Sequence, residues 1–416
     1  MRVRSFILAW LVTGVAIASC TAAINWLIDP YLMFDMPRLR HFNERKPSVL
    51  THEREMKAYL VKRAAPTTVL IGTSRVALGL DAKHPAWPER LRPVYNLGLP
   101  GGGPYTWLRY LQHALSDDGI KEVVIGLDFE YFLAPDGWYQ DPAKEGTEFD
   151  HRLAVTRQGI PNQFWRRQRL IDVGQALLSL DGLRDSIITV RANLTADSAD
   201  LDRSGNLSDA EFRRDVAQLG AFPLFENRNR QTLQRLAIEL RLRYSDGQRE
   251  VSPMAILRLI LELCRKHDIA VILFVQPVHA SLLEAYDLLQ HWHDFEAWKR
   301  DLVALAGDSQ RRRGLDLSLW DFSGYNRYSE ETVPEPGDRK TRLQWFWDPA
   351  HYTRSLGDVI IRSLFAANAE NFGVRLTADS LEQHLDRTRQ HQKLYQAAHP
   401  ETRARLAQLY QGISKR

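Results

Sequence analysis

The chain has 416 residues, of which 44% are hydrophobic and 25% are charged, a composition typical of a folded globular protein. This length fits two to three domains, or one α/β domain that carries insertions. The 55 Lys and Arg residues against 51 Asp and Glu residues give a net charge of only +4, which argues against a dedicated nucleic-acid-binding protein. The two cysteines, Cys20 and Cys264, are too few for a disulfide framework or a zinc ribbon.

The N-terminal segment 5–28 is a run of 24 residues without a charge. At about 1.5 Å per residue, a helix of this length covers a hydrocarbon core of about 30 Å. We therefore expect an uncleaved transmembrane signal anchor. The alternative is a lipoprotein signal, because Ile17-Ala18-Ser19-Cys20 fits the pattern in which a cysteine is lipidated after cleavage.

The orientation of this anchor follows less directly from charge. Arg2 and Arg4 precede the segment, and four basic residues follow it: Arg38, Arg40, Arg45 and Lys46. A short N-terminal tail before a large domain favours a location of that domain outside the cytoplasm.

Beyond the anchor, short apolar runs alternate with helical patterns, which predicts a parallel sheet flanked by helices. The expected strands are 67–72, 123–129, 270–275 and 315–322, with a further short strand before Asn96. The expected helices are 43–64, 105–116, 253–267, 280–306 and 353–367.

A polar, Arg-rich stretch interrupts this alternation and has apolar residues at helical spacing. We therefore predict the following division of the chain: a first part of an α/β domain at 41–132, a mainly helical insertion or cap at 133–248, a second part of the α/β domain at 249–377, and a helical C-terminal tail at 378–416.

Ser74 lies directly after the first predicted strand, in the sequence Ile71-Gly72-Thr73-Ser74-Arg75. The carboxyl ends of the strands line the ligand crevice of an open α/β sheet, so Ser74 is well placed to act as a nucleophile. A serine at such a position is also a common helix N-cap, and this alternative stays open.

A glycine-rich bend follows the next predicted strand, between Gly98 and Gly103. Such a bend can direct backbone N–H groups toward a developing oxyanion, as acyl transfer requires, or it can be a plain turn. Gly98 and Gly101 are the candidate oxyanion residues. The sequence is neither a dinucleotide fingerprint nor a phosphate-binding P-loop.

Asp348 and His351 stand three residues apart before the last periodic helix, in Trp347-Asp348-Pro349-Ala350-His351. This spacing lets the carboxylate hold the imidazole in one tautomer. Helix capping explains Asp348 and Pro349 equally well but leaves His351 without a role.

These three elements resemble the SGNH (GDSL-like) hydrolase superfamily, in which the nucleophile follows the first strand and an Asp-x-x-His motif lies near the C-terminal end. The chain is most similar to the membrane-anchored branch that includes the alginate O-acetylation proteins and the D-alanine transfer protein of teichoic acids. The similarity includes the N-terminal anchor, the stretch Asn25-Trp26 to Asp29-Pro30-Tyr31, and Gly-Thr-Ser-Arg in place of Gly-Asp-Ser. It implies a three-layer, flavodoxin-like α/β fold.

The resemblance implies that Ser74 is the nucleophile, His351 its general base and Asp348 the residue that orients His351. The chain departs from the family after the strand 123–129, where a Gly-x-Asn-Asp block is missing. A third oxyanion donor is therefore in doubt.

Further residues at strand ends are candidate substrate contacts. Arg75 follows the nucleophile, Asp128 and Glu130 end the strand 123–129, and Trp347 flanks Asp348. His279 follows the strand 270–275 and is either a substrate contact or a residue that starts the next helix. No cofactor is expected. No metal site is expected either, because the pair His291 and His293 would point to different sides of a helix.

The resemblance implies an extracytoplasmic O-acyltransferase anchored in the bacterial inner membrane, with its main domain in the periplasm. Its expected reaction is O-acetyl transfer to a cell-surface polysaccharide through an acyl-serine intermediate. Because acetyl-CoA is cytoplasmic, a membrane-bound O-acyltransferase is the implied partner and acyl donor. The alternatives are an esterase or deacetylase of the same fold, or a non-catalytic glycan-binding scaffold of a polysaccharide modification or export complex.

Overall fold

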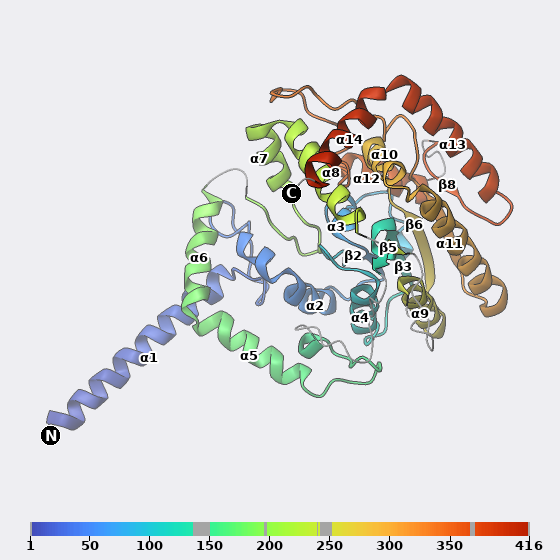
Figure 1. The fold of residues 1–416 in the computed structure, drawn as a ribbon. Helices are drawn as coiled ribbons and strands as arrows, with labels where there is room; N and C mark the ends of the chain where they lie inside the picture. Colours follow the sequence, from blue (N-terminus) through green and yellow to red (C-terminus); the bar gives the residue numbers. More distant parts are fainter. Residues whose placement is uncertain are drawn as a thin grey trace. The chain divides into compact units, whose positions relative to one another are not determined.

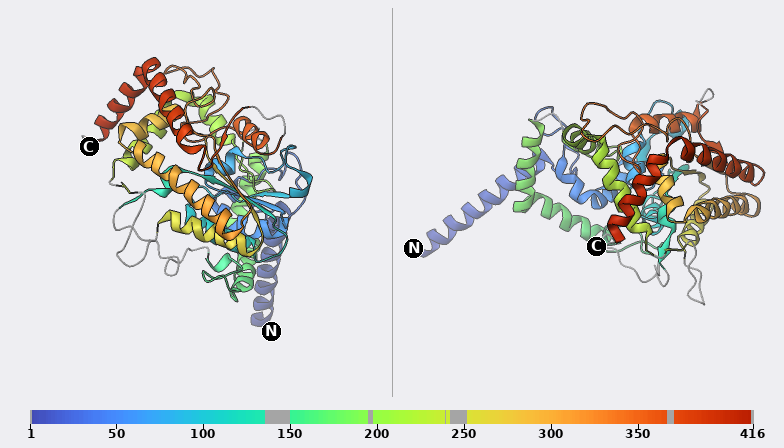
Figure 2. Two further views of the ribbon diagram at one scale, coloured as in Figure 1. Left: turned by 90° about the vertical axis from the view of Figure 1, so that its right-hand side faces the viewer. Right: turned by 45° about the horizontal axis from the view of Figure 1, so that its top comes forward.

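The computed structural model describes residues 2–135, 150–194, 198–238, 240–241, 252–366 and 371–414. The chain divides into two compact units, which are coloured along the sequence in Figures 1 and 2. The anchor unit contains the residues up to Arg63, the described residues from 150 to Arg203, and Leu207–Glu211. The sheet unit contains the rest.

The sheet unit is built on a six-stranded sheet with the order β2-β1-β3-β6-β7-β8, in which β8 alone is antiparallel to its neighbour. The strands are β1 (Thr68–Ile71), β2 (Val94–Asn96), β3 (Glu122–Leu127), β6 (Ala270–Val275), β7 (Leu317–Asp321) and β8 (Val374–Arg375). Val69 pairs with Val123, and Val123 pairs with Val271, so the carboxyl ends of the central strands lie at one edge. A separate two-stranded sheet joins β4 (Ala134–Pro135) and β5 (Leu240–Arg241).

Helices cover both faces of this sheet, as the apolar composition of its strands requires. Residues of α3 (Ser74–Gly79) and α12 (Arg354–Phe365) pack with Leu70 and Val124 in one core cluster. The other face carries α4 (Pro104–Ala114), α9 (Pro253–Lys266) and α11 (Trp292–Arg313), where α9 contacts both of the other helices (Figure 1). The expected α/β class with a mainly parallel sheet flanked by helices is therefore confirmed.

Four of the expected strands are found within one or two residues of their predicted ends, and the short strand before Asn96 is β2. β8 was not expected, because two residues carry no periodicity that a sequence pattern can detect. It pairs antiparallel with β7 and is the edge strand on that side of the sheet.

The expected helix 280–306 is wrong, because the chain forms two helices there, α10 (Ala280–Leu288) and α11. Gln290 separates them with a φ of 63°, a left-handed conformation that ends a helix. The expected helix 43–64 is also shorter than predicted. A 3₁₀-helix occupies Pro47–His52 and the α-helix α2 spans Glu53–Ala64.

The stretch 133–248, expected to be one helical insertion, contributes helices to both units where the structure describes it. α5 (Trp165–Leu178) and α6 (Leu180–Asn193) belong to the anchor unit, with a short 3₁₀-helix at Asp150–Arg152 before them. α8 (Ala221–Leu236) belongs to the sheet unit, and α7 (Ala210–Leu219) begins at the boundary. Residues 136–149, 195–197, 239 and 242–248 of this stretch lie outside the described residues.

The two ends of the chain are helical. The N-terminal helix α1 (Arg2–Ile28) is long and apolar enough over Val3–Ile28 to cross a membrane, with a mean hydropathy of 2.1. The C-terminal tail forms α13 (Leu381–Ala398) and α14 (Pro400–Ser414), which contact each other, and α14 packs on α8 and α10. Two further 3₁₀-helices lie next to strands of the sheet. Glu89–Leu91 precedes β2, and Phe129–Phe132 follows β3.

Candidate active site

Ser74 is the first residue of α3, immediately beyond the carboxyl end of β1. Thr73 is the N-cap, and its hydroxyl accepts a hydrogen bond from the Arg75 amide. The turn is tight, because a Cβ on Gly72 would lie 2.4 Å from Val76. The N-cap role predicted as the alternative for Ser74 is therefore filled by Thr73, which leaves the Ser74 hydroxyl for other contacts.

The structure brings Ser74, His351 and Asp348 into one hydrogen-bonded chain. Ser74 Oγ lies 2.8 Å from His351 Nε2, and His351 Nδ1 lies 2.8 Å from Asp348 Oδ2. With Nδ1–H donating to Asp348, Nε2 is an acceptor for the hydrogen bond from the Ser74 hydroxyl. This is the arrangement that makes a serine hydroxyl a nucleophile.

Asp348 is held in place by its own loop. Its Oδ1 accepts hydrogen bonds from the amides of Ala350 and His351, at 2.7 and 2.8 Å. Burial alone would raise the pKa of Asp348, but the charge and hydrogen bonding of His351 and the Arg228 guanidinium hold it well below its usual range. Asp348 thus remains a carboxylate and fixes the tautomer of His351.

Two close approaches of backbone place His351 beside Ser74. A Cβ on Gly357 would lie 1.8 Å from the carbonyl oxygen of Gly79, so α12 and α3 touch through their backbones. The ring of Tyr352 lies against Gly79, where a Cβ would be 2.0 Å from it. These glycines let the end of α3 and the start of α12 meet; Ser74 begins α3, and Asp348 and His351 lie in the loop that leads into α12.

Arg228, on α8, is a member of the site that the sequence did not indicate. Its Nε lies 3.3 Å from Asp348 Oδ2, and its Nη2 lies 3.4 Å from His351 Nδ1. About a third of its side chain is exposed. The guanidinium therefore adds a positive charge beside the carboxylate that orients the histidine.

Aromatic rings cover the histidine. Phe212, on α7, stacks on Trp347 with ring centroids 5.9 Å apart and contacts the ring of His351 at 5.3 Å. Trp347 is half-buried. The place of Trp347 beside the Ser–His–Asp chain keeps it a candidate substrate contact, and Phe212 joins it there.

The next three candidate substrate contacts form a buried charged cluster: Arg75, Asp128 and Glu130. All three are buried, and Arg75 Nη1 lies 2.8 Å from Asp128 Oδ1 while its Nη2 lies 3.6 Å from Glu130. Asp128 also accepts hydrogen bonds from Thr73 at 2.7 Å and from Gln276 at 2.8 Å. These contacts hold the turn that carries Ser74, and a role of the three side chains in substrate contact stays a prediction.

The glycine-rich bend lies beside the nucleophile turn, since the Leu99 amide donates to the carbonyl oxygen of Gly72 at 2.8 Å. The Gly98 amide, however, donates to Asn96 Oδ1 at 3.0 Å, and a Cβ on Gly98 would lie 2.6 Å from the Ala77 nitrogen. Gly98 is thus a packing residue here and not the expected oxyanion donor. Gly101 is exposed with a φ of +68°, and its role as a donor stays a prediction.

His279 is buried and starts a helix, which is the second of its two expected roles. Its Nδ1 accepts a hydrogen bond from the Ser281 amide at 3.1 Å, and its Nε2 lies 2.8 Å from the carbonyl oxygen of Glu331. Burial lowers the pKa of His279 to about 4, so the ring is neutral at pH 7. Both ring nitrogens are engaged within the protein, and a role of His279 as a substrate contact stays a prediction.

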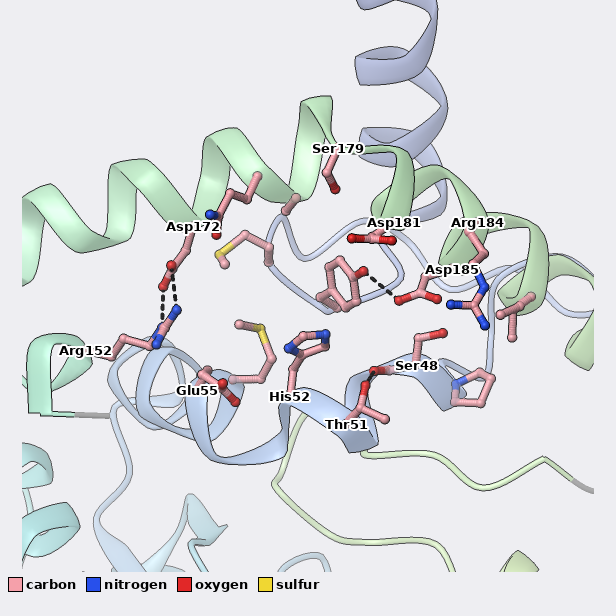
Figure 3. Close-up of a pocket in the computed structure, with 17 residues that line it drawn as sticks. Ser48, Thr51, His52, Glu55, Arg152, Asp172, Ser179, Asp181, Arg184 and Asp185 are labelled. Carbon is pink, nitrogen blue, oxygen red and sulfur yellow. Dashed lines mark hydrogen bonds and ion pairs between the residues drawn. The ribbon is translucent and has the colours of Figure 1, made fainter. Parts of the chain in front are cut away.

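The anchor unit has a separate cavity of about 770 Å³, lined by α2, α5, α6 and the residues after α1 (Figure 3). Two side-chain contacts lie in its wall: Arg152 pairs with Asp172 at 2.7 Å, and the Tyr31 hydroxyl donates to Asp185 at 2.6 Å. The Ser–His–Asp chain lies in the sheet unit and is not part of this cavity.

Comparison of the chain with the models of known protein families finds no match, and neither does comparison with curated proteins. The chemistry of the site therefore stands on its geometry.

Proposed function

We propose that this chain is a membrane-anchored serine O-acyltransferase of the SGNH-like type, which transfers an acyl group, most simply acetyl, to a hydroxyl of a cell-surface polysaccharide. The observation that carries the proposal is the unbroken hydrogen-bonded chain from Ser74 Oγ through His351 to Asp348. It stands at the carboxyl end of β1, where open α/β sheets bind their ligands.

In the first half-reaction, Ser74 Oγ attacks the acyl carbonyl while His351 Nε2 takes the hydroxyl proton. Collapse of the tetrahedral intermediate breaks the bond to the leaving group, which receives that proton, and leaves the acyl ester on Ser74. In the second half-reaction, the sugar hydroxyl gives its proton to His351 and attacks the ester. The proton then returns to Ser74 Oγ, and the enzyme is regenerated.

Two features support the family assignment. The order β2-β1-β3-β6-β7 is the doubly wound order of flavodoxin-like sheets. The Asp348-x-x-His351 pair precedes the last helix that packs on the sheet. The missing Asn block stays a departure, since Asp128 at that position pairs with Arg75.

The proposed acyl donor is a multi-spanning membrane-bound O-acyltransferase, because an enzyme outside the cytoplasm has no access to acetyl-CoA. The length and hydropathy of α1 support a single-pass membrane anchor. We propose that this membrane is the bacterial inner membrane and that the sheet unit belongs to its periplasmic side. An esterase would use the same three residues and differ only in accepting water in place of the sugar.

The test is intact-mass analysis of the full chain after exposure to a serine-directed fluorophosphonate. We expect one adduct, mapped to Ser74, which Ser74→Ala and His351→Ala abolish and the matched control Ser116→Ala keeps. An adduct elsewhere, or an unchanged adduct in His351→Ala, would exclude the proposed nucleophile. Sugar acceptors added to an acylated sample then separate the transferase from the esterase.

A further inference from the structure

The helix α6 carries an apolar stripe on its outer side. Leu180, Leu183, Ile187, Val190 and Leu194 recur at spacings of three and four residues, which places them on one face. Leu180 is 76% exposed, Ile187 54% and Leu194 71%. Soluble proteins seldom expose so continuous an apolar face, so this stripe needs a partner.

The helix α5 continues the same feature. Leu170, Ile171 and Leu178 are exposed on it, and Phe164 is exposed just before its first turn. Positions 164, 171 and 178 follow one another at intervals of seven residues and share a face. We call the exposed apolar residues of α5 and α6, with Phe164, the apolar ledge.

The ledge is fixed to the end of α1. Asn25 lies within the uncharged span, and its Nδ2 donates to the carbonyl oxygen of Leu177, the next-to-last residue of α5, at 2.9 Å. Its Oδ1 accepts a hydrogen bond from Ser186 on α6, also at 2.9 Å. Tyr31 donates to Asp185 on α6 at 2.6 Å (Figure 3). The corner between α5 and α6 is therefore level with the last turns of α1.

Figure 1 shows α5 and α6 meeting at the C-terminal end of α1 and running away from it on two sides. If α1 crosses a bilayer, helices attached at Asn25 reach the boundary between the hydrocarbon and the headgroups. An amphipathic helix at this depth buries its apolar face among the acyl chains.

The exposed charges of the two helices are mainly positive, and Asp181 is the one exposed acidic side chain on them. Five arginines are exposed on α5 and α6: Arg166, Arg167, Arg169, Arg184 and Arg191. The acidic side chains Asp172 and Asp185 instead bond inward, to Arg152 and Tyr31. Exposed arginines beside an apolar stripe favour anionic lipid headgroups.

From these observations we propose that α5 and α6 form a monotopic platform that lies in the membrane interface around the exit of α1, with the apolar ledge among the lipid acyl chains. The proposal rests on α1 being the membrane anchor of the proposed function. The platform makes the anchor unit a fixed base on the membrane, in contrast to a domain tethered by one helix alone.

The test uses nitroxide labels on the full chain in vesicles of phosphatidylethanolamine and phosphatidylglycerol. Cys20→Ser removes the exposed cysteine, while Cys264 is buried and its thiol pKa is raised to about 12, so it stays unlabelled. Single cysteines are then placed in the ledge (Leu178→Cys, Ile187→Cys), on another side of α6 (Asp181→Cys), and midway along α1 (Val15→Cys). Relaxation by oxygen reports lipid, and relaxation by a water-soluble nickel complex reports water.

We expect the labels at 178 and 187 to resemble the label at 15, with oxygen the stronger relaxing agent, and the label at 181 to show the reverse. Water-like behaviour at 178 and 187 beside a lipid-like label at 15 would overturn the platform and leave the anchor intact. Exclusion of both agents would show that protein covers the ledge, which also overturns the proposal. A water-like label at 15 would remove the anchor itself, whereas the Ser74 adduct tests the chemistry independently.

Discussion

Asp348 and Arg228 set the surroundings of the His351 imidazole on its Nδ1 side. Asp348 accepts hydrogen bonds from His351 Nδ1–H and from two backbone amides, and Arg228, on α8, neutralises part of its charge. A carboxylate with four donors around it has little freedom to move, so it holds one imidazole tautomer at little cost in entropy.

Asp348→Asn therefore tests the orientation of His351. An amide at this position offers its NH₂ group to Nδ1 as readily as its oxygen, which favours the wrong tautomer. We expect the rate of fluorophosphonate labelling at Ser74 to fall by about 10³- to 10⁴-fold with the fold retained. Arg228→Met, which leaves the carboxylate in place, should cost far less, and equal losses in the two variants would contradict this division of roles.

His279 gives a second prediction, on stability against pH. Its pKa is about 4 in the folded protein and about 6.5 in an unfolded chain, so the unfolded state binds the proton first as the pH falls. Stability is therefore lost between about pH 6.5 and pH 4, and at about 1.4 kcal/mol per pKa unit this loss amounts to roughly 3 kcal/mol.

His279→Asn keeps an acceptor for the Ser281 amide but does not titrate. Although this variant is less stable at neutral pH, because Phe225 and Phe346 lose a packed ring, its unfolding temperature should change less between about pH 6.5 and 4.5 than that of the wild type. An equal pH dependence in both proteins would mean that His279 is not the group responsible.

At the scale of elements, the contact between α3 and α12 assembles the site. Gly357 faces the carbonyl oxygen of Gly79, and Tyr352 fills the space beside it, so both helix ends meet without intervening side chains. Ser74 begins α3, and His351 lies in the loop directly before α12, so a small displacement of α12 lengthens the distance between Ser74 and His351.

Gly357→Ala should push α12 away, because the new Cβ would lie 1.8 Å from a backbone oxygen. Overpacking of this kind costs about 1–3 kcal/mol or more, and we expect both the unfolding temperature and the rate of Ser74 labelling to fall. Gly412→Ala is the control, since a Cβ at that helical position meets open space and should be neutral or stabilising by up to about 1 kcal/mol. Unimpaired labelling in Gly357→Ala would contradict the role assigned to this contact.

The parts of the site that the sequence could predict are those with a local signal. Ser74 follows an apolar strand, and the Asp348-x-x-His351 spacing is short, so both could be placed at the same edge of the sheet before their contact was known. Arg228 and Phe212 lie more than 100 residues from these motifs on helices of ordinary composition, and only the folded chain brings them together. The buried pairing of Arg75 with Asp128 likewise depends on two strands becoming neighbours.

At the scale of the whole molecule, the residues of the proposed chemistry and those of the proposed membrane attachment belong to different units. The sheet unit contains the Ser–His–Asp chain, and the anchor unit contains α1 with the helices fixed to Asn25. In the proposed function, one unit would carry out acyl transfer and the other would attach the chain to the membrane.

The central claim is that Ser74 carries an acyl group during turnover, and it is tested most directly by the mass of that peptide. The full chain is purified from its native membrane under acid quench, where an ester survives, and the peptide that contains Ser74 is weighed beside the same peptide from Asp348→Asn and Ser74→Ala. We predict that the wild-type peptide carries the mass of one acyl group on Ser74, and that this mass is reduced in Asp348→Asn and lost in Ser74→Ala together with acylation of the surface polysaccharide. A polysaccharide that is still fully acylated in a folded Ser74→Ala protein would contradict the account.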